Sequence, residues 1–324
     1  MLYVATIGGN SYREAASVFY RLKDKLRRQR FSAKCQDILK TPPVSLRGGS
    51  NVAVLSQLQH KDLLMFLLAL KSFANEVPVE HVYLLNDGSL TSDDVALLRT
   101  HVPGFKLLEL HDFQGSSCPR GGCWERLLAI AELVKKHYVI QLDSDTLTIG
   151  ALPELIENVR HGAAFTIGTW DNQEIETMQE RCATAKARHP DSGSHVQLVA
   201  EANFDKLKRF ESLRYVRGCA GFAGFPQHSF SKEFVEEISN EMEAAMGTKW
   251  TNWGSEQVMS NIVVANIGNA RVLPHPKYSD CLKMKPPGTV FIHFIGSCRF
   301  NQGIYERMGG EIIESLMKSG GVNA

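Results

Sequence analysis

Between residues 52 and 142 the chain alternates short apolar runs, typical of strands, with longer apolar or amphipathic runs, typical of helices. The expected strands cover 52–57, 81–87, 105–110 and 138–142, and the expected helices cover 62–75, 91–98 and 123–138. This order predicts an α/β fold with a mostly parallel central sheet flanked by helices, of the Rossmann-like type. Such sheets bind ligands beyond the carboxyl ends of their strands, so residues that follow a strand are the first site candidates.

The composition excludes several classes of protein. With 324 residues, 44% hydrophobic and 22% charged, the chain has the balance of an ordinary soluble globular protein. Its formal net charge of +1 is too small to create an overall positive potential that would attract nucleic acid, so no nucleic-acid partner is expected. The start of the chain lacks the features of a signal peptide, and the longest aliphatic run, 63–70, is far shorter than the ~20 residues that span a bilayer. We therefore expect a cytoplasmic protein, at most peripheral on the inner face of a membrane, with its seven cysteines reduced.

Residues 1–50 are expected to form a unit of their own ahead of the main domain, residues 51–324. A short strand over 2–6 precedes a helix from about Ser11, and residues 40–51, rich in proline, glycine and serine, are typical of a linker. Residues 20–34 carry seven lysines or arginines and one aspartate. Two interpretations stay open for this basic helix: a solvated face, or peripheral contact with anionic lipid on a membrane.

Two aspartates, Asp143 and Asp145, directly follow the expected strand over 138–142. Residues two apart on an extended chain point the same way, and carboxylates held side by side repel each other unless a cation lies between them. Mg²⁺ or Mn²⁺, which take oxygen ligands and leave room for phosphate oxygens, suit this arrangement. A polar turn that caps a helix near Pro153 explains the same residues without a metal. Haloacid dehalogenase phosphatases also place D-x-D after a strand, but Leu147 stands where they have threonine or valine.

A second polar group lies near the carboxyl end of the chain. Residues 290–300 predict a strand that carries His293, followed at three-residue intervals by Gly296 and Arg299. An imidazole beside two carboxylates favours Mn²⁺ over Ca²⁺. Gly296 would let the backbone approach a phosphate, and Arg299 would neutralise phosphate charge. The pattern therefore predicts a nucleotide diphosphate held on a metal ion by Asp143, Asp145 and His293.

These motifs resemble those of GT-A-fold glycosyltransferases, most closely the retaining group that contains glycogenin and the bacterial lipopolysaccharide galactosyltransferases. The resemblance extends from about Val52 to Arg299. The family's D-x-D matches Asp143-Ser144-Asp145, and its H-x-x-G-x-x-K matches His293, Gly296 and, with arginine in place of lysine, Arg299. A basic residue in the helix before D-x-D corresponds to Arg126, the N-A-G segment to Cys219-Ala220-Gly221, and a D-Q pair at a helix start to Glu256 and Gln257.

The chain departs from that family at three places. Arg299 keeps the charge of the lysine but changes its geometry, Cys219 replaces an asparagine near the donor sugar, and Phe300 with Asn301 replaces proline and tryptophan. The matched residues also have plain structural interpretations. These are a surface charge for Arg126, a tight backbone contact for Gly221, and solvated first-turn residues after a Ser255 cap for Glu256 and Gln257.

The resemblance implies a metal-dependent hexosyltransferase of the retaining type, which moves a sugar from a UDP-sugar to a hydroxyl on a glycan, a lipid-linked sugar or a protein. It implies a metal ion, Mn²⁺ or Mg²⁺, on Asp143, Asp145 and His293, and catalytic positions at Glu256 and Gln257. The implied donor contacts are Leu55, Ser56, Gln57, Arg126, Ser144, Gly221, Gly296 and Arg299. In an inverting reaction Glu256 would be the candidate base.

Three questions stay open at this level. The polar segment 170–215 is either a lid over the acceptor or an inert surface insertion. An inactive binding or scaffold protein with the same fold is one alternative to a transferase. A sugar nucleotidyltransferase is the other, although the glycine-rich basic loop expected after its first strand is missing here.

Overall fold

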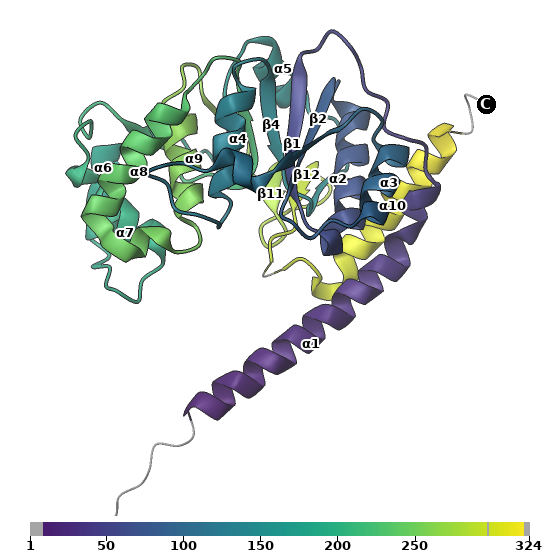
Figure 1. Ribbon diagram of the computed structural model, residues 1–324, viewed down its shortest axis with the longest axis horizontal. Coiled ribbons are helices and arrows are strands. Elements are labelled where there is room, and N and C mark those ends of the chain that lie inside the picture. Colours follow the sequence, from purple (N-terminus) through teal and green to yellow (C-terminus); the bar gives the residue numbers. More distant parts are fainter. Residues whose placement is uncertain (1–8, 297, 321–324) are drawn as a thin grey trace, which may run out of the picture.

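The computed structural model describes residues 9–296 and 298–320, and its centre is a seven-stranded sheet with the order β10-β6-β9-β4-β1-β2-β3 (Figure 1). The strands β1 (Val52–Leu58), β2 (His81–Asn86), β3 (Lys106–Glu109) and β4 (Tyr138–Leu142) run parallel to one another, and β6 (Phe165–Ile167) runs parallel to β10 (Arg271–Leu273). In contrast, β9 (Cys219–Phe225) is antiparallel to both of its neighbours. The predicted α/β fold with a mostly parallel sheet is confirmed.

Two smaller sheets accompany the large one. The first has the order β11-β12-β5 and contains β11 (Tyr278–Asp280), β12 (Phe291–His293) and β5 (Thr146–Thr148). The second pairs β7 (Glu176–Thr177) with β8 (Arg214–Tyr215). The α-helices are α1 (Gly9–Cys35), α2 (Leu63–Glu76), α3 (Ser92–His101), α4 (Trp124–Leu133), α5 (Pro153–Arg160), α6 (Met178–Lys186), α7 (Val196–Ala202), α8 (Lys232–Met246), α9 (Ser255–Ala265) and α10 (Ile304–Gly320). Short 3-10 helices include η2 (His60–Asp62) and η5 (Gly247–Thr251).

The sheet is buried on both faces, which explains why its strands are apolar throughout. In β1, Val52 and Val54 face one hydrophobic cluster, while Ala53 and Leu55 face the other. Side chains of α2, α3 and α10 complete the first cluster, and side chains of α4, α8 and α9 complete the second. The sheet therefore lies between two helical layers, and its strand ends are where polar side chains can gather.

The helix expected over 91–98 is present as α3, whereas one strand is much shorter than expected. Thr91 and Asp94 form a capping box at the start of α3. The strand expected over 290–300 is confined to β12, because the chain turns after His293: the amides of Cys298 and Arg299 both donate to the carbonyl of Ile295, at 2.9 Å. Segment 170–215 contains β7, α6, α7 and β8, so it is an ordered addition rather than a plain loop.

The basic helix is confirmed as α1, which runs beside α10 and then continues past the body of the molecule (Figure 1). The strand expected over 2–6 lies outside the described residues. The carboxyl half of α1 belongs to the same hydrophobic cluster as β1, since Phe31 and Cys35 are buried there. Phe31 packs on Tyr305 of α10, with ring centroids 4.6 Å apart. The division of the chain at residue 50 stays a prediction.

The expectation of reduced cysteines is wrong for one pair. Cys281, just after β11, and Cys298, after β12, form a disulfide across a sequence separation of 17. The two cysteines are distant in sequence from the closely spaced pair, Cys118 and Cys123, which both stay free. Within the described part of the chain, no helix combines the length and the apolar composition needed to cross a bilayer.

Candidate metal and donor site

The candidate site begins in the turn that follows β4. The amide of Asp143 donates to the carbonyl of Gly221 on β9 at 2.9 Å, and the amide of Thr146 donates to the carbonyl of Asp143 at 3.2 Å. The Thr146 hydroxyl donates to the same carbonyl at 2.8 Å. The turn does not cap the next helix, because α5 starts after Leu152 without a side-chain cap. The polar turn thus exists, and it serves to present the two aspartates.

His293 is brought to this turn by β12. This strand pairs antiparallel with β5, and the register sets His293 opposite Thr146. The imidazole Nε2 lies 3.1 Å from Oδ1 of Asp145 and 3.8 Å from Oδ2 of Asp143. One ligand atom from each of the three residues lies within 4.8 Å of the other two. The structure therefore brings together all three predicted metal ligands, although 148 residues separate Asp145 from His293.

Two arginines contact the aspartates through the oxygens that His293 does not approach. Nη1 of Arg126, on α4, lies 2.5 Å from Oδ1 of Asp143, and Arg299 donates to Oδ2 of Asp145. This arrangement leaves Oδ2 of Asp143, Oδ1 of Asp145 and Nε2 of His293 facing one another. Two carboxylate oxygens and one imidazole nitrogen are a donor set that suits Mn²⁺ or Mg²⁺. The residues present therefore fit a divalent cation.

Burial and mutual charge perturb the proton affinities of this group. Burial alone would raise the pKa of Asp145, but the charges and hydrogen bonds of His293 and Arg299 lower it to about 2. For His293, burial acts to lower the pKa, and the neighbouring Cys219 and Asp145 raise it well above its ordinary value. Asp145 is thus held ionised, while His293 keeps a proton that a metal ion would have to displace on binding.

Two residues of β9, Cys219 and Gly221, hold the imidazole of His293 in place. The Cys219 sulfur lies 2.9 Å from Nδ1, the ring nitrogen that faces away from the aspartates. Gly221, two residues further along β9, lies against the ring face: a Cβ there would be 2.1 Å from Cε1 of His293. Cys219 therefore contacts the ring nitrogen opposite the Nε2 atom that would bind a metal, the position where metal-binding histidines usually have a carboxylate, a carbonyl or a water as partner. The sequence drew attention to Cys219 only because it replaces the asparagine of the family motif. Its contact with His293 was not predicted.

Glu256 lies at the start of α9. One interpretation of the sequence made it a solvated first-turn residue, but its side chain is buried. Both of its carboxylate oxygens lie 3.4 Å from Nη2 of Arg126, and both side chains are buried. Burial raises the pKa of Glu256 to about 7, with Asp143 adding to the shift and Arg126 opposing it. The expected Ser255 cap is wrong, because the N-cap of α9 is Gly254 and the Ser255 hydroxyl instead accepts from the indole of Trp124. Trp124 was not predicted; it fixes the start of α9 next to the arginine.

The remaining predicted donor residues fall into two groups. Leu55 and Ser56 are fully buried in β1, where the Ser56 hydroxyl donates to the carbonyl of Leu142 at 2.5 Å. Gln57 is half-buried, and its side-chain oxygen has no hydrogen-bond partner in the described structure. The others lie nearer solvent: Ser144 and Gln257 are half-buried, and Gly296 is exposed. Apart from the chain neighbours of Gly296, the described residues place no heavy atom within 4 Å of its Cβ position.

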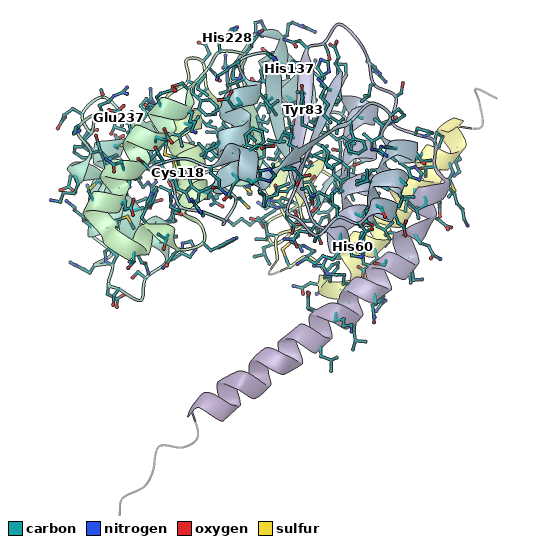
Figure 2. All side chains as sticks on the ribbon, viewed as in Figure 1. His60, Tyr83, Cys118, His137, His228 and Glu237 are labelled. Carbon is teal, nitrogen blue, oxygen red and sulfur yellow. A yellow bond between two sulfur atoms is a disulfide. The ribbon has the colours of Figure 1, made fainter. Side chains whose placement is uncertain are left out.

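Cys219, Gly221 and the pairs around Arg126 thus surround the carboxyl end of β4. The opposite end of the sheet carries another polar pair, Tyr83 and His137, labelled in Figure 2, whose hydroxyl and Nε2 lie 2.9 Å apart. His137 precedes β4, whereas Asp143 follows it. The Tyr83–His137 pair therefore lies toward the amino end of β4, away from the aspartates. It takes no part in the candidate site.

No protein-family model and no curated protein matches the sequence. Solved structures do match, at low identity. Core-mannan synthase A from Aspergillus fumigatus, in its Mn/GDP form, is 10% identical, with a TM-score of 0.40, over 71% of this chain and 73% of that chain. Mouse xyloside xylosyltransferase 1 is 13% identical, with a TM-score of 0.45, over 76% of this chain and 98% of that chain.

The galactosyltransferase LgtC, in complex with donor and acceptor sugar analogues, is 13% identical, with a TM-score of 0.43, over 81% of this chain and 95% of that chain. These solved structures are glycosyltransferases, the class that the sequence motifs resemble. At these identities the similarity concerns the fold alone. The chemistry of the site must be argued from its own residues.

Proposed function

We propose that this chain is a metal-dependent glycosyltransferase that moves a sugar from a nucleotide diphosphate to an acceptor hydroxyl. The observation that supports this most directly is the meeting of Asp143, Asp145 and His293 within 4.8 Å, at the carboxyl end of a parallel strand. Such a ligand set, next to two arginines, suits a diphosphate better than an uncharged ligand.

Each residue has a defined task in this proposal. The metal ion, Mn²⁺ or Mg²⁺, would be held by Asp143, Asp145 and His293, and it would supply positive charge to the departing nucleotide diphosphate. Arg126 and Arg299 add further positive charge for the phosphate oxygens. Gly296 leaves open space where its backbone can approach a phosphate, because among the described residues no heavy atom apart from its chain neighbours lies within 4 Å of its Cβ position.

The stereochemical course is proposed to be retaining, with a hexose as the transferred sugar. In that course the leaving phosphate takes the proton of the acceptor hydroxyl, and Glu256 with Gln257 positions the donor sugar. A pKa of about 7 for Glu256 would also suit a general base near neutral pH, which is what the inverting alternative requires. The anomeric configuration of the product, read by proton NMR, distinguishes the two courses.

The finer assignments are proposals of the same kind. We propose a UDP-sugar as donor, with Leu55, Ser56 and Gln57 supporting the base, and Ser144 and Gly221 near the sugar. The acceptor would be a glycan, a lipid-linked sugar or a protein, under a lid formed by segment 170–215. The cytoplasmic location at the inner face of a membrane stays a prediction.

A ligand-binding assay tests the proposal before any acceptor is known. Thermal unfolding is followed with UDP, GDP, CDP and their sugars, each with Mn²⁺ and with EDTA. A ligand at 100 times its Kd stabilises the protein by about 2.7 kcal/mol, which shifts the midpoint measurably. We expect a shift with UDP-sugars that requires Mn²⁺.

Two aspartate variants make this assay specific. Asp145→Ala should abolish the metal-dependent shift, whereas Asp93→Ala, which removes an exposed aspartate in the first turn of α3, should keep it. Absence of a shift with every nucleotide in the wild-type protein would refute the donor site. A shift of equal size in Asp145→Ala and wild type would refute the metal site.

A further inference from the structure

The carboxyl half of helix α1 has one side packed against the rest of the molecule. Phe31 and Cys35 are buried against α10 and its surroundings. Arg28 forms an ion pair with Asp62 of η2 at 2.5 Å, and its guanidinium lies 5.5 Å from the centroid of the Phe300 ring. This half of α1 is therefore firmly attached to the segment that follows β12.

The opposite side of the same helix carries apolar side chains in solvent. Leu22 and Leu26 are 56% and 59% exposed. At 100° per residue they lie roughly 140–180° around the helix from Phe31, one turn apart from each other. The two exposed leucines therefore form an unpartnered apolar strip on this helix, which extends away from the body of the molecule in Figure 1.

The strip is bordered by positive charge. Lys23 lies on one side of the leucines and Lys25 on the other, and both are exposed. Neither lysine forms an ion pair with another side chain that the structure describes. Asp24, the one acidic residue among residues 20–34, is turned toward the attached side, where its carboxylate lies 4.0 Å from Arg28. We call Leu22, Lys23, Lys25 and Leu26 the outer face of α1.

Two exposed leucines flanked by cations suit some partners better than others, and three can be compared: a second copy of the chain, a nucleic acid and an anionic bilayer. A second copy of the chain that packed strip against strip would bring the lysines of the two copies together, and like charges repel. A nucleic acid would pair with the cations but would leave the two leucines in water. The interface of a bilayer that contains anionic lipid accepts both, because leucines enter the acyl boundary while the cations reach the headgroups.

We propose that the outer face of α1 docks the protein on an anionic bilayer surface. The helix then lies in the plane of the interface, with its apolar strip toward the acyl chains and its attached side toward the rest of the protein. This inference rests on α1 alone and does not depend on the proposed transferase activity.

Vesicle sedimentation with the full chain tests it. The vesicles are phosphatidylcholine alone, or phosphatidylcholine with about one-third phosphatidylserine, at about 0.1 M and 0.5 M salt. We expect binding to the anionic vesicles at low salt, and much weaker binding to the neutral ones. Each cation near an anionic surface is worth about five-fold in partitioning, so Lys23→Glu/Lys25→Glu should weaken binding by about 25-fold or more.

The leucines separate lipid insertion from simple charge attraction. Leu22→Gln/Leu26→Gln, which removes the apolar groups without adding charge, should lose about ten-fold or more in binding. Leu282→Gln, which alters a leucine that is 63% exposed just after β11, should bind as the wild type does. Thermal unfolding and the nucleotide-induced shift should be unchanged in all three variants, which keeps this result separate from that of the proposed function.

Three results would overturn the inference. The first is a wild-type protein that fails to sediment with anionic vesicles. The second is equal binding by wild type and the leucine variant, which would mean attraction to any polyanion, nucleic acid included. The third is a leucine-dependent dimer in analytical ultracentrifugation that leaves vesicles unbound, which would assign the strip to a second copy.

Discussion

Substitution of Gly221 by alanine should disable the metal site by displacing a ligand rather than by removing one. The Cβ of an alanine would lie 2.1 Å from Cε1 of His293, 2.6 Å from Nδ1 and 2.8 Å from Nε2. The imidazole must retreat by about 1.3 Å for Cε1 to reach the 3.4 Å at which ordinary contact begins. Metal–ligand distances tolerate about 0.2 Å, so His293 would no longer lie where Asp143 and Asp145 can share a cation with it.

The size of the effect follows from the lost ligand geometry. Disturbing the partners that orient a metal-binding histidine costs roughly 10–100-fold in metal affinity. A displacement of this size belongs at the upper end, about 100-fold, which corresponds to ~2.7 kcal/mol of binding free energy. The added methyl group also overpacks the interior, at about 1–3 kcal/mol of unfolding free energy.

The matched control is Gly224→Ala on the same strand. There the new Cβ would lie 2.1 Å from Cε1 of Phe165, the same clash against a ring that binds no metal. Both variants should lose similar stability in urea unfolding. Free Mn²⁺, measured by its electron paramagnetic resonance signal in a titration of the protein, should show weakened binding for Gly221→Ala and near-normal binding for Gly224→Ala.

Mn²⁺ binding of wild-type strength in Gly221→Ala would refute this reasoning, since the ring could then move without cost or would not be a ligand. Equal loss of binding in both variants would point instead to general damage to β9.

Three further predictions concern the surroundings of the site. The folded protein favours protonated Glu256, so the stability from this group is present below pH about 4.5 and lost as pH rises to about 7. The loss is about 3 kcal/mol at most, and urea unfolding at several pH values should give a flatter profile for Glu256→Gln; identical profiles would contradict the buried environment. Cys219→Ala removes the partner of the Nδ1 atom of His293 and should weaken Mn²⁺ binding about ten-fold, as measured by the same titration, while unchanged affinity would deny Cys219 an orienting role. Reduction of the Cys281–Cys298 disulfide should lower the free energy of unfolding by about 3 kcal/mol, seen as a lower midpoint in dithiothreitol, and Cys298→Ser should show the lower midpoint with or without the reductant.

The charges of the candidate site are closely matched, and this bears on how a ligand enters it. Asp143, Asp145 and Glu256 face Arg126 and Arg299, and His293 completes the group. A diphosphate brings negative charge and its metal brings positive charge, so the pair can join this network with little change in its balance. Binding of a nucleotide without a metal, or of a metal without a nucleotide, is expected to be weaker than binding of the two together.

The sequence alone determined those features that depend on neighbours along the chain. The capping box at Thr91 and Asp94 follows from residues three apart, and it is present. The placement of Asp143 and Asp145 follows from a buried strand and the carboxyl end of a parallel sheet. His293 could be added because its spacing to Gly296 and Arg299 matched a family motif, and it does meet the aspartates.

Tertiary structure decided which buried groups touch. Arg126 and Glu256, 130 residues apart, form one pair, and Cys219 lies on the ring of His293, 74 residues away. The disulfide of Cys281 and Cys298 and the packing of Phe31 on Tyr305 are of the same kind. The physical reason is that apolar periodicity shows which side of a strand or helix is buried, whereas the pairing of side chains from different elements depends on sheet order and register, which sequence spacing does not encode.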